Sequence, residues 1–136
     1  MRKSDLLHLL HQLATEGIWA LSGRALCRLM QVSPANRSVS LARSCQDGVI
    51  IRLARGFYRN SLASLPHNHL ERLANWLRPN DWFYLSQESA LHDAGYLQQI
   101  PNRLTFVTTG RTDLYHTPLG ILEFTHTERP PVQWWH

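Results

Sequence analysis

The apolar residues at the start of the chain recur at the spacing of a helix. Leucines occur at positions 6, 7, 9, 10 and 13, with polar residues between them. This spacing predicts an amphipathic helix over residues 4–16, with Ser4 as its N-cap and Gly17 as its terminator. The apolar residues 18–20 that follow predict a short extended segment.

Two further helices are predicted before residue 50. Ser22 is placed to cap a helix over residues 23–30. Ser33 followed by Pro34 is a start signal for a third helix, over residues 34–47, which stops at Gly48. In the second helix we expect four residues to face inward: Ala25, Leu26, Leu29 and Met30. In the third we expect one side to carry Val39, Ala42 and Cys45 or Gln46, and the opposite side to carry Asn36, Arg37, Ser40, Arg43 and Ser44.

The stretch "GVIIRLARGFYRN" then changes to the pattern of a hairpin. Val49, Ile51 and Leu53 alternate with Ile50, Arg52 and Ala54, and this period of two residues indicates a strand. Arg55-Gly56 supplies a turn, because glycine adopts the positive φ that tight hairpins need. Residues 57–59 are expected to return as a second strand.

The second half of the chain has its own pattern after the joint "NSLASLPHN". Asn68 is placed to cap a helix over residues 69–78, and Pro79 ends it. "DWFYLS", "RLTFVTTG" and "DLYHTPLGILEFTHT" indicate strands, and a short helix is expected from Ser86 to Gly95. Residues 67–127 are therefore predicted to form a small mixed α/β domain, followed by a Pro/Trp tail over residues 128–136.

The order of elements in the first half is that of a winged helix-turn-helix. A helix, a short strand, two helices and a hairpin occur in that sequence over residues 1–62. We therefore predict an α+β protein, with an N-terminal winged helix-turn-helix followed by the small mixed α/β domain. In the winged fold, the third helix enters the major groove of DNA and the hairpin lies along the flanking backbone.

Charge separates the two halves. Residues 1–65 carry nine Lys and Arg against three acids, a net +6, whereas residues 66–136 carry five against seven, a net −2. Thirteen of the fourteen basic residues are arginine, whose planar fork binds phosphates and guanine edges with two hydrogen bonds. The first half is therefore expected to bind a polyanion, with double-stranded DNA as the partner.

The expected DNA contacts lie on the third helix and on the hairpin. Asparagine and arginine near the start of the helix have the chemistry to read adenine and guanine edges. The hairpin arginines are placed to neutralise phosphates and to probe the minor groove. The full set is Ser33, Asn36, Arg37, Ser40, Arg43, Arg52, Arg55 and Arg59.

Composition excludes several other classes of protein. No run of about 18 apolar residues exists, so we expect no membrane span. Cys27 and Cys45 stand alone, which favours a reduced, cytoplasmic protein. The pairs His8/His11 and His67/His69 have no third ligand at a convincing spacing, so we predict no metal and no cofactor.

Several motifs of the chain resemble the AbiEi family, the antitoxins and self-repressors of type IV toxin–antitoxin systems. They are "RLARGFYRN" after the third helix, then "YLSQESALHDAGYLQQIPNRLTFVTTGR", then "TPLGILEFTHT". The likeness covers about residues 5–127 and is to a short form, since many members continue further after the last motif. It implies a transcriptional repressor that binds operator DNA through the winged helix and represses its own operon. It also implies a nucleotidyltransferase-like toxin as a partner for the C-terminal region.

Two other functions remain open. The first is a protein-interaction module without DNA readout, and Trp134-Trp135 are candidate contacts for such a partner or for self-association on repeated operator sites. The second is a metal-dependent nuclease using Asp81, Glu88, Asp113 and Glu123. Nucleases of the restriction type usually place a lysine after the second acidic pair, and the single lysine of this chain is Lys3. We therefore predict a protein without catalytic activity.

Overall fold

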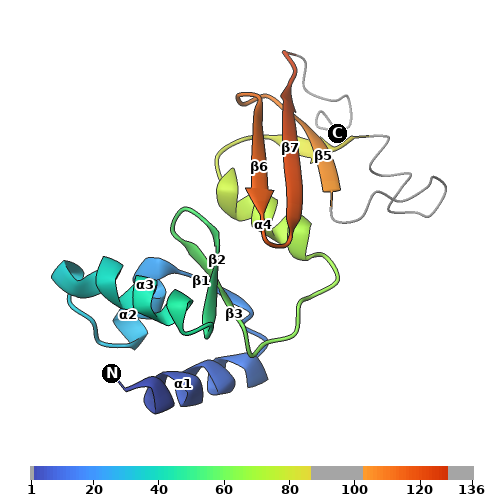
Figure 1. The fold of residues 1–136 in the computed structure, drawn as a ribbon. Coiled ribbons are helices and arrows are strands. Elements are labelled where there is room, and N and C mark those ends of the chain that lie inside the picture. Colours follow the sequence, from blue (N-terminus) through green and yellow to red (C-terminus); the bar gives the residue numbers. More distant parts are fainter. Residues whose placement is uncertain (1, 87–102, 129–136) are drawn as a thin grey trace. The chain divides into compact units, whose positions relative to one another are not determined.

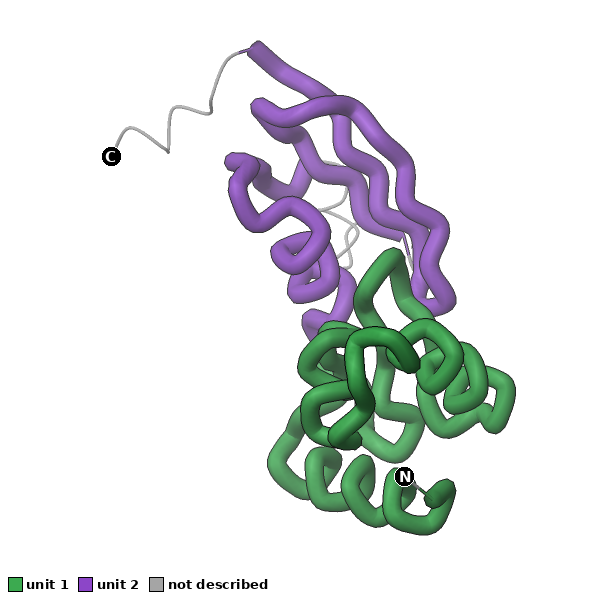
Figure 2. Tube along the Cα trace, turned by 90° about the vertical axis from the view of Figure 1, so that its left-hand side faces the viewer, with its two compact units in different colours: residues 1–67 green, residues 68–136 purple. Residues whose placement is uncertain are grey.

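The computed structural model describes residues 2–86 and 103–128, and the chain divides into two compact units, residues 1–67 and 68–136 (Figure 1, Figure 2). The described residues form four α-helices and two sheets, so the protein is mixed α+β, as the sequence predicts. None of the described helices is long and apolar enough to cross a membrane. The helix expected after Ser86 and the Trp134-Trp135 tail lie outside the described residues.

The first unit contains three helices and three strands in the order that the sequence predicts. The strands form an antiparallel sheet in the order β1-β3-β2, and the hairpin between β2 and β3 turns at Arg55-Gly56. The third helix starts later than expected, because a 3₁₀ turn, η1, precedes it. The bounds are α1 Lys3–Thr15, β1 Ala20–Ser22, α2 Gly23–Leu29, η1 Pro34–Asn36, α3 Arg37–Gln46, β2 Ile50–Ala54 and β3 Phe57–Asn60.

The three helices of this unit end in the same way. Each is followed by a residue in the left-handed conformation: Gly17 with φ +79°, Gln31 with φ +59° and Gly48 with φ +76°. After α1, the N–H of Ile18 donates to the Leu13 carbonyl at 3.0 Å, the long bond of a Schellman motif. Gly17 and Gly48 were predicted as terminators and are confirmed. Gln31 carries a side chain where glycine is favoured, so the turn between α2 and α3 is strained.

The helix starts agree with the sequence at one position and differ at another. Ser22 caps α2, since its Oγ accepts from the N–H of Ala25 at 3.1 Å. The prediction of Ser4 as the cap of α1 is wrong: α1 begins at Lys3, so Ser4 lies in the first turn and Arg2 takes the cap position. Arg2 has no short side-chain oxygen that could accept a hydrogen bond from the first turn. The serine at position 4, a residue favoured at N-caps, was therefore a misleading signal for the start of α1.

The core of the first unit is built from the apolar faces of the helices and from β2. Leu10 and Leu26 are fully buried, and Ile50 is 1% exposed. The prediction that Leu29 faces inward is wrong, because its side chain is 44% exposed. Cys27 is buried in place of Leu29. The buried pair Leu26 and Cys27 therefore defines which side of α2 faces the core.

One polar side chain, that of Asn60, is fully buried at the end of β3. Its Nδ2 donates to the carbonyls of Leu10 at 2.8 Å and Ile18 at 3.2 Å, and its Oδ1 accepts from the N–H of Leu62 at 3.1 Å. Its own backbone N–H donates to the Trp19 carbonyl at 2.8 Å. Asn60 therefore joins α1, the segment before β1 and the start of the linker at one point.

Replacing Asn60 should destabilise the first unit. Asn60→Ala leaves buried carbonyls and an N–H with fewer partners, and we expect a loss of about 1–3 kcal/mol in the free energy of unfolding. Asn60→Asp is nearly isosteric but turns an oxygen toward two carbonyls, so its loss should be larger. Gln12→Ala, at an exposed position of α1, is the control and should change stability by less than about 0.5 kcal/mol.

Urea unfolding followed by circular dichroism measures these losses, and hydrogen exchange locates them in residues 1–67. An Asn60→Ala protein as stable as the parent would contradict the role given to this amide.

The second unit packs a helix on a sheet whose described strands have the order β4-β5-β7-β6. Strands β5 and β7 run parallel, and the other neighbours are antiparallel. Helix α4 contacts β7. The predicted helix after Asn68 and the predicted strands are confirmed, with the bounds α4 His69–Leu77, β4 Phe83–Leu85, β5 Arg103–Thr108, β6 Asp113–Thr117 and β7 Gly120–His126.

Aromatic rings form the core of this unit around the fully buried Phe124. Its ring stacks on Phe106 with centroids 5.2 Å apart and meets Phe83 and Tyr115 edge-on at 5.5 and 5.7 Å. Edge-on and offset arrangements of this kind are favourable because the positive ring edge meets the negative ring face. The guanidinium of Arg78 lies over the Phe124 ring, 4.7 Å from its centroid.

Arg78 is a buried charge with specific partners. Its side chain is 5% exposed; Nη1 donates to Asp81 Oδ2 at 2.9 Å and Nε donates to Tyr115 Oη at 3.1 Å. Burial lowers the pKa of Arg78, but these hydrogen bonds outweigh it and the net pKa is raised, so the residue stays charged. Gly110 makes room for the pair, because a Cβ there would lie 2.2 Å from Asp81 Oδ2.

Removing this guanidinium should unfold the second unit more easily. Arg78→Ala leaves Asp81 and the Tyr115 hydroxyl without their donor and empties the space above Phe124, so we expect a loss of about 3 kcal/mol. Arg72→Ala, at an exposed position of α4, the helix that Arg78 follows, should lose less than about 0.5 kcal/mol. Urea unfolding with hydrogen exchange in residues 68–128 distinguishes them, and equal stabilities of the two variants would refute this account.

Candidate nucleic-acid interface

The exposed face of α3 differs from the one that the sequence predicts. Val39 is 60% exposed and Ala42 is exposed beside Arg43, so the prediction that they line the side opposite Arg43 is wrong. Ser44, expected on the polar side, is 6% exposed, and the buried apolar residue is Leu41. Leu41 and Ser44 are three positions apart and so share a helix face. The outward face of α3 is therefore Ser38, Val39, Ala42, Arg43 and Gln46.

Close packing at Gly23 explains this rotation of α3. A Cβ at Gly23 would lie 3.1 Å from Leu41 Cδ1 and 3.1 Å from Tyr58 Cε2, so the start of α2 is in contact with both α3 and β3. The N–H of Gly23 also donates to the Gly56 carbonyl at 2.9 Å, at the hairpin turn. Leu41 thus fits against α2 and the hairpin, and the rest of α3 turns with it.

The predicted contact residues differ in exposure. Asn36 and Ser33 are exposed before the start of α3, and the Asn36 amide donates to Ser33 Oγ at 3.2 Å. Arg43 is exposed on α3 itself. Exposed side chains in the predicted set are Ser33, Asn36, Arg43, Arg52 and Arg55, and half-buried ones are Arg37, Ser40 and Arg59.

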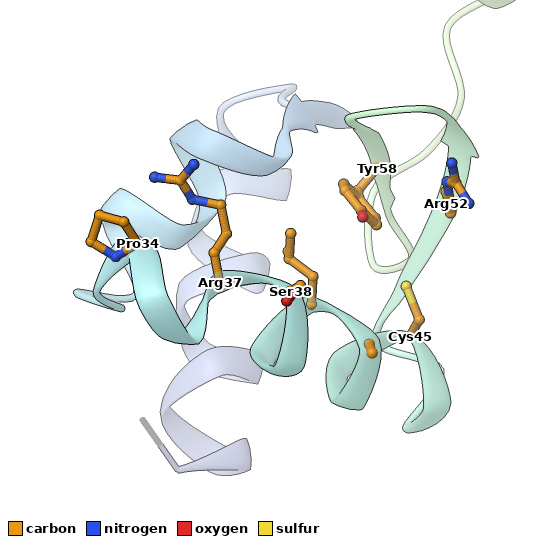
Figure 3. Close-up of a pocket in the computed structure, with 8 residues that line it drawn as sticks. Pro34, Arg37, Ser38, Cys45, Arg52 and Tyr58 are labelled. Atoms are coloured by element: carbon orange, nitrogen blue, oxygen red, sulfur yellow. The ribbon is translucent and has the colours of Figure 1, made fainter.

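Two of the predicted arginines line a hollow between α3 and the hairpin, at its opposite sides (Figure 3). Arg37 rises from the start of α3 and Arg52 from β2, with Tyr58 between them. The hollow measures about 650 Å³. Arg37 Nε is buried in the structure and has no hydrogen-bond partner among the described residues. The lining residues are Pro34, Arg37, Ser38, Leu41, Ala42, Cys45, Arg52 and Tyr58.

A second hollow lies on the other flank of α3, toward α1. It measures about 690 Å³, and Lys3 of α1, Asn36, Ser40 and Arg43 are among the residues that line it. Val39 lines it as well. Lys3 was not predicted as a contact residue, since only the fold brings the start of α1 beside α3. The outward face of α3 therefore has a cationic hollow along each side.

Arg59 does not join the other hairpin arginines. Arg52 is paired with Tyr58 across the hairpin, whereas Arg59 is paired with Ile51. Because successive residues of a strand point to opposite faces of a sheet, Arg59 projects from the face opposite Tyr58. Arg55 is exposed at the turn, beside Gly56 with φ +81°. The turn thus has the positive φ that the sequence predicted.

The positive charge of the first unit is not neutralised by ion pairs. Within residues 2–67, none of the eight arginines lies within 4.0 Å of a carboxylate oxygen. Burial raises the pKa of the Cys45 thiol, although the backbone N–H and the guanidinium of Arg52 oppose the shift. Burial likewise raises the pKa of Tyr58. Both groups are neutral at pH 7, so the charges beside α3 are those of Lys3, Arg37, Arg43 and Arg52, with one carboxylate, Asp47, in the hollow toward α1.

The described acidic residues considered for a nuclease each interact with another protein group. Asp81 is paired with Arg78, and Glu123 with Arg103. Asp113 Oδ1 accepts from the N–H of Leu114 at 2.8 Å, and Glu88 lies outside the described residues. Among residues 2–86 and 103–128, no group of three or more His, Cys, Asp or Glu is arranged to hold a metal ion.

Comparison with known proteins gives no family for this chain: no family model matches it, and no curated protein matches it in sequence.

Proposed function

We propose that the protein binds double-stranded DNA through the first unit, with a winged helix-turn-helix arrangement of α2, α3 and the β2–β3 hairpin. The observation that carries this proposal is the outward face of α3, which has a hollow lined by Arg37 and Arg52 on one side and a hollow lined by Lys3 and Arg43 on the other. The order of elements supports it, because a helix exposed in this way fits the major groove while the hairpin reaches the flanking backbone. The net +6 of residues 1–65 supplies attraction to phosphates.

The exposed side chains suggest two roles for the proposed DNA-contacting residues: reading base edges and binding phosphates. Asn36 and Arg43, exposed at the start and on the outward face of α3, are placed to read base edges. Arg52 and Arg55 on the hairpin bind phosphates, and Arg37 and Lys3 do so from the two hollows. Arg59 points away from this group, and we expect the smallest contribution from it.

Binding should depend strongly on salt. With about five phosphate contacts, the logarithm of the affinity should fall against the logarithm of salt concentration with a slope of about −4 to −5. Arg52→Ala or Arg55→Ala should flatten this slope by about one and weaken all sequences alike. Arg43→Ala should cost about 1–3 kcal/mol on a preferred sequence and less on random DNA.

Arg72→Ala is the matched control, since it removes the same charge from an exposed position of α4. Fluorescence anisotropy with labelled duplexes at several salt concentrations measures all four variants. If Arg72→Ala weakened binding as much as Arg43→Ala, the binding would reflect net charge alone. A chain that failed to bind any duplex at low salt would favour the protein-interaction function instead.

We further propose that this binding represses transcription of the protein's own operon, as the resemblance to the AbiEi family suggests. The second unit carries a net −2 over residues 66–136, so it is a poor ligand for DNA. We assign it to protein contact, either with a second copy on repeated operator sites or with a nucleotidyltransferase-like toxin. No catalytic step is part of this function.

The tail gives a test of the protein contact. Changing Trp134 and Trp135 to Ala removes two large apolar side chains of the kind enriched in interfaces, so cooperativity on two-site DNA or binding to the toxin should drop. Affinity for a single site should be unchanged, because the tail belongs to the second unit. Gel shifts on one-site and two-site DNA, with analytical ultracentrifugation, measure both. A variant equal to the parent in every assay would place the contact elsewhere.

A further inference from the structure

Val39 is the large apolar side chain on the outward face of α3, beside the polar Ser38, Arg43 and Gln46. It is the third residue of α3 and is 60% exposed. Single exposed apolar residues are common and by themselves indicate nothing. Val39 differs because the hollow toward α1 that it lines also contains Lys3, Asn36 and Arg43, which offer hydrogen-bond donors and two positive charges against the one carboxylate there, Asp47.

The surroundings of Val39 define the kind of molecule that would cover it. Cations on both flanks of α3 attract phosphates, and donors beside Val39 suit base edges. An apolar side chain there gains energy only if an apolar group meets it. In the major groove, the one apolar group that a base pair presents is the C5-methyl of thymine.

We propose that Val39 reads a thymine methyl in the major groove and is a specificity-determining residue of the DNA site; this inference rests on the proposed DNA binding. The valine is suited to this role, because its χ1 angle is nearly fixed in a helix and little side-chain freedom is lost on contact. Ala42, exposed one turn later, extends the apolar strip on the same face.

The spacing to Arg43 places the thymine within the site. Val39 and Arg43 are four residues apart on one face of α3, which is about 6 Å along the helix axis. Base pairs are spaced by about 3.4 Å. The thymine should therefore lie within about two or three base pairs of the group that Arg43 contacts.

Replacement of single thymines by deoxyuridine tests this directly. A preferred duplex is first selected from a random library with the full chain, and each of its thymines is then replaced in turn, which removes one methyl and leaves base pairing intact. At one position of the selected duplex, the affinity of the parent protein should fall about fourfold, the value expected for one buried methyl. Val39→Ala should bind the parent duplex with a similar loss and should be insensitive to deoxyuridine at that position.

Matched variants separate this contact from a change in folding. Val39→Ala places a better helix former at an exposed site, so α3 should be retained. Leu62→Ala removes an exposed apolar side chain, 45% exposed in the segment after β3, and should keep the full deoxyuridine effect. Methylation interference on the same duplex should place the Arg43 contact within three base pairs of the sensitive thymine.

The outcomes distinguish this inference from the function on which it rests. Specific, salt-dependent binding with no loss at any deoxyuridine position would overturn the role of Val39 and leave DNA binding intact. A deoxyuridine effect that persists in Val39→Ala would assign the methyl to another residue and would also overturn it. Absence of binding to any duplex at low salt would overturn both proposals.

Discussion

The geometry of the first unit depends on the buried amide of Asn60. A buried amide is stable only when its donors and acceptors are satisfied, so the segments that satisfy it cannot shift independently. Asn60 connects Leu10 of α1, Ile18 before β1 and Leu62 after β3. Strand β3 is the central strand of the sheet, between β1 and β2. The hydrogen bond from Asn60 to Leu10 therefore fixes the position of α1 relative to the whole sheet.

Within the first unit, the side chain of Leu41 determines which face of α3 is exposed to solvent. Leu41 packs where Gly23 leaves space beside Tyr58, and a helix with one large buried side chain has one favourable rotation. The small Ser44 then comes to lie inside, and Val39 and Arg43 outside. The contact surface is thus a consequence of packing on the opposite side of the same helix. A change at Gly23 would therefore alter the surface that we propose to contact DNA, although Gly23 itself is buried behind it.

Features fixed by local chemistry were predictable from the sequence, and features fixed by packing were not. The Ser22 cap, the ends at Gly17 and Gly48 and the turn at Gly56 each depend on a few adjacent residues. The outward position of Val39 depends on Leu41, α2 and the hairpin together, so periodicity in a ten-residue helix assigned the wrong face. Gln31 gave no signal of its left-handed conformation, since glycine is the usual residue there. The sequence proposes the arginines of the DNA site by residue type alone, and only the sheet register separates Arg59 from Arg52.

Arginine has opposite physical roles in the two units. In the second unit, Arg78 and Arg103 are paired with Asp81 and Glu123, and Arg78 is part of the core. In residues 2–67 no arginine is paired with a carboxylate, which leaves their charges available to an external anion. Unpaired like charges on a small unit repel one another, and this destabilises the compact state unless a polyanion neutralises them. Binding of phosphates would relieve that repulsion, so DNA should stabilise the first unit in proportion to the cations that it engages. The second unit, whose residues 66–136 carry a net −2, should not be stabilised by DNA.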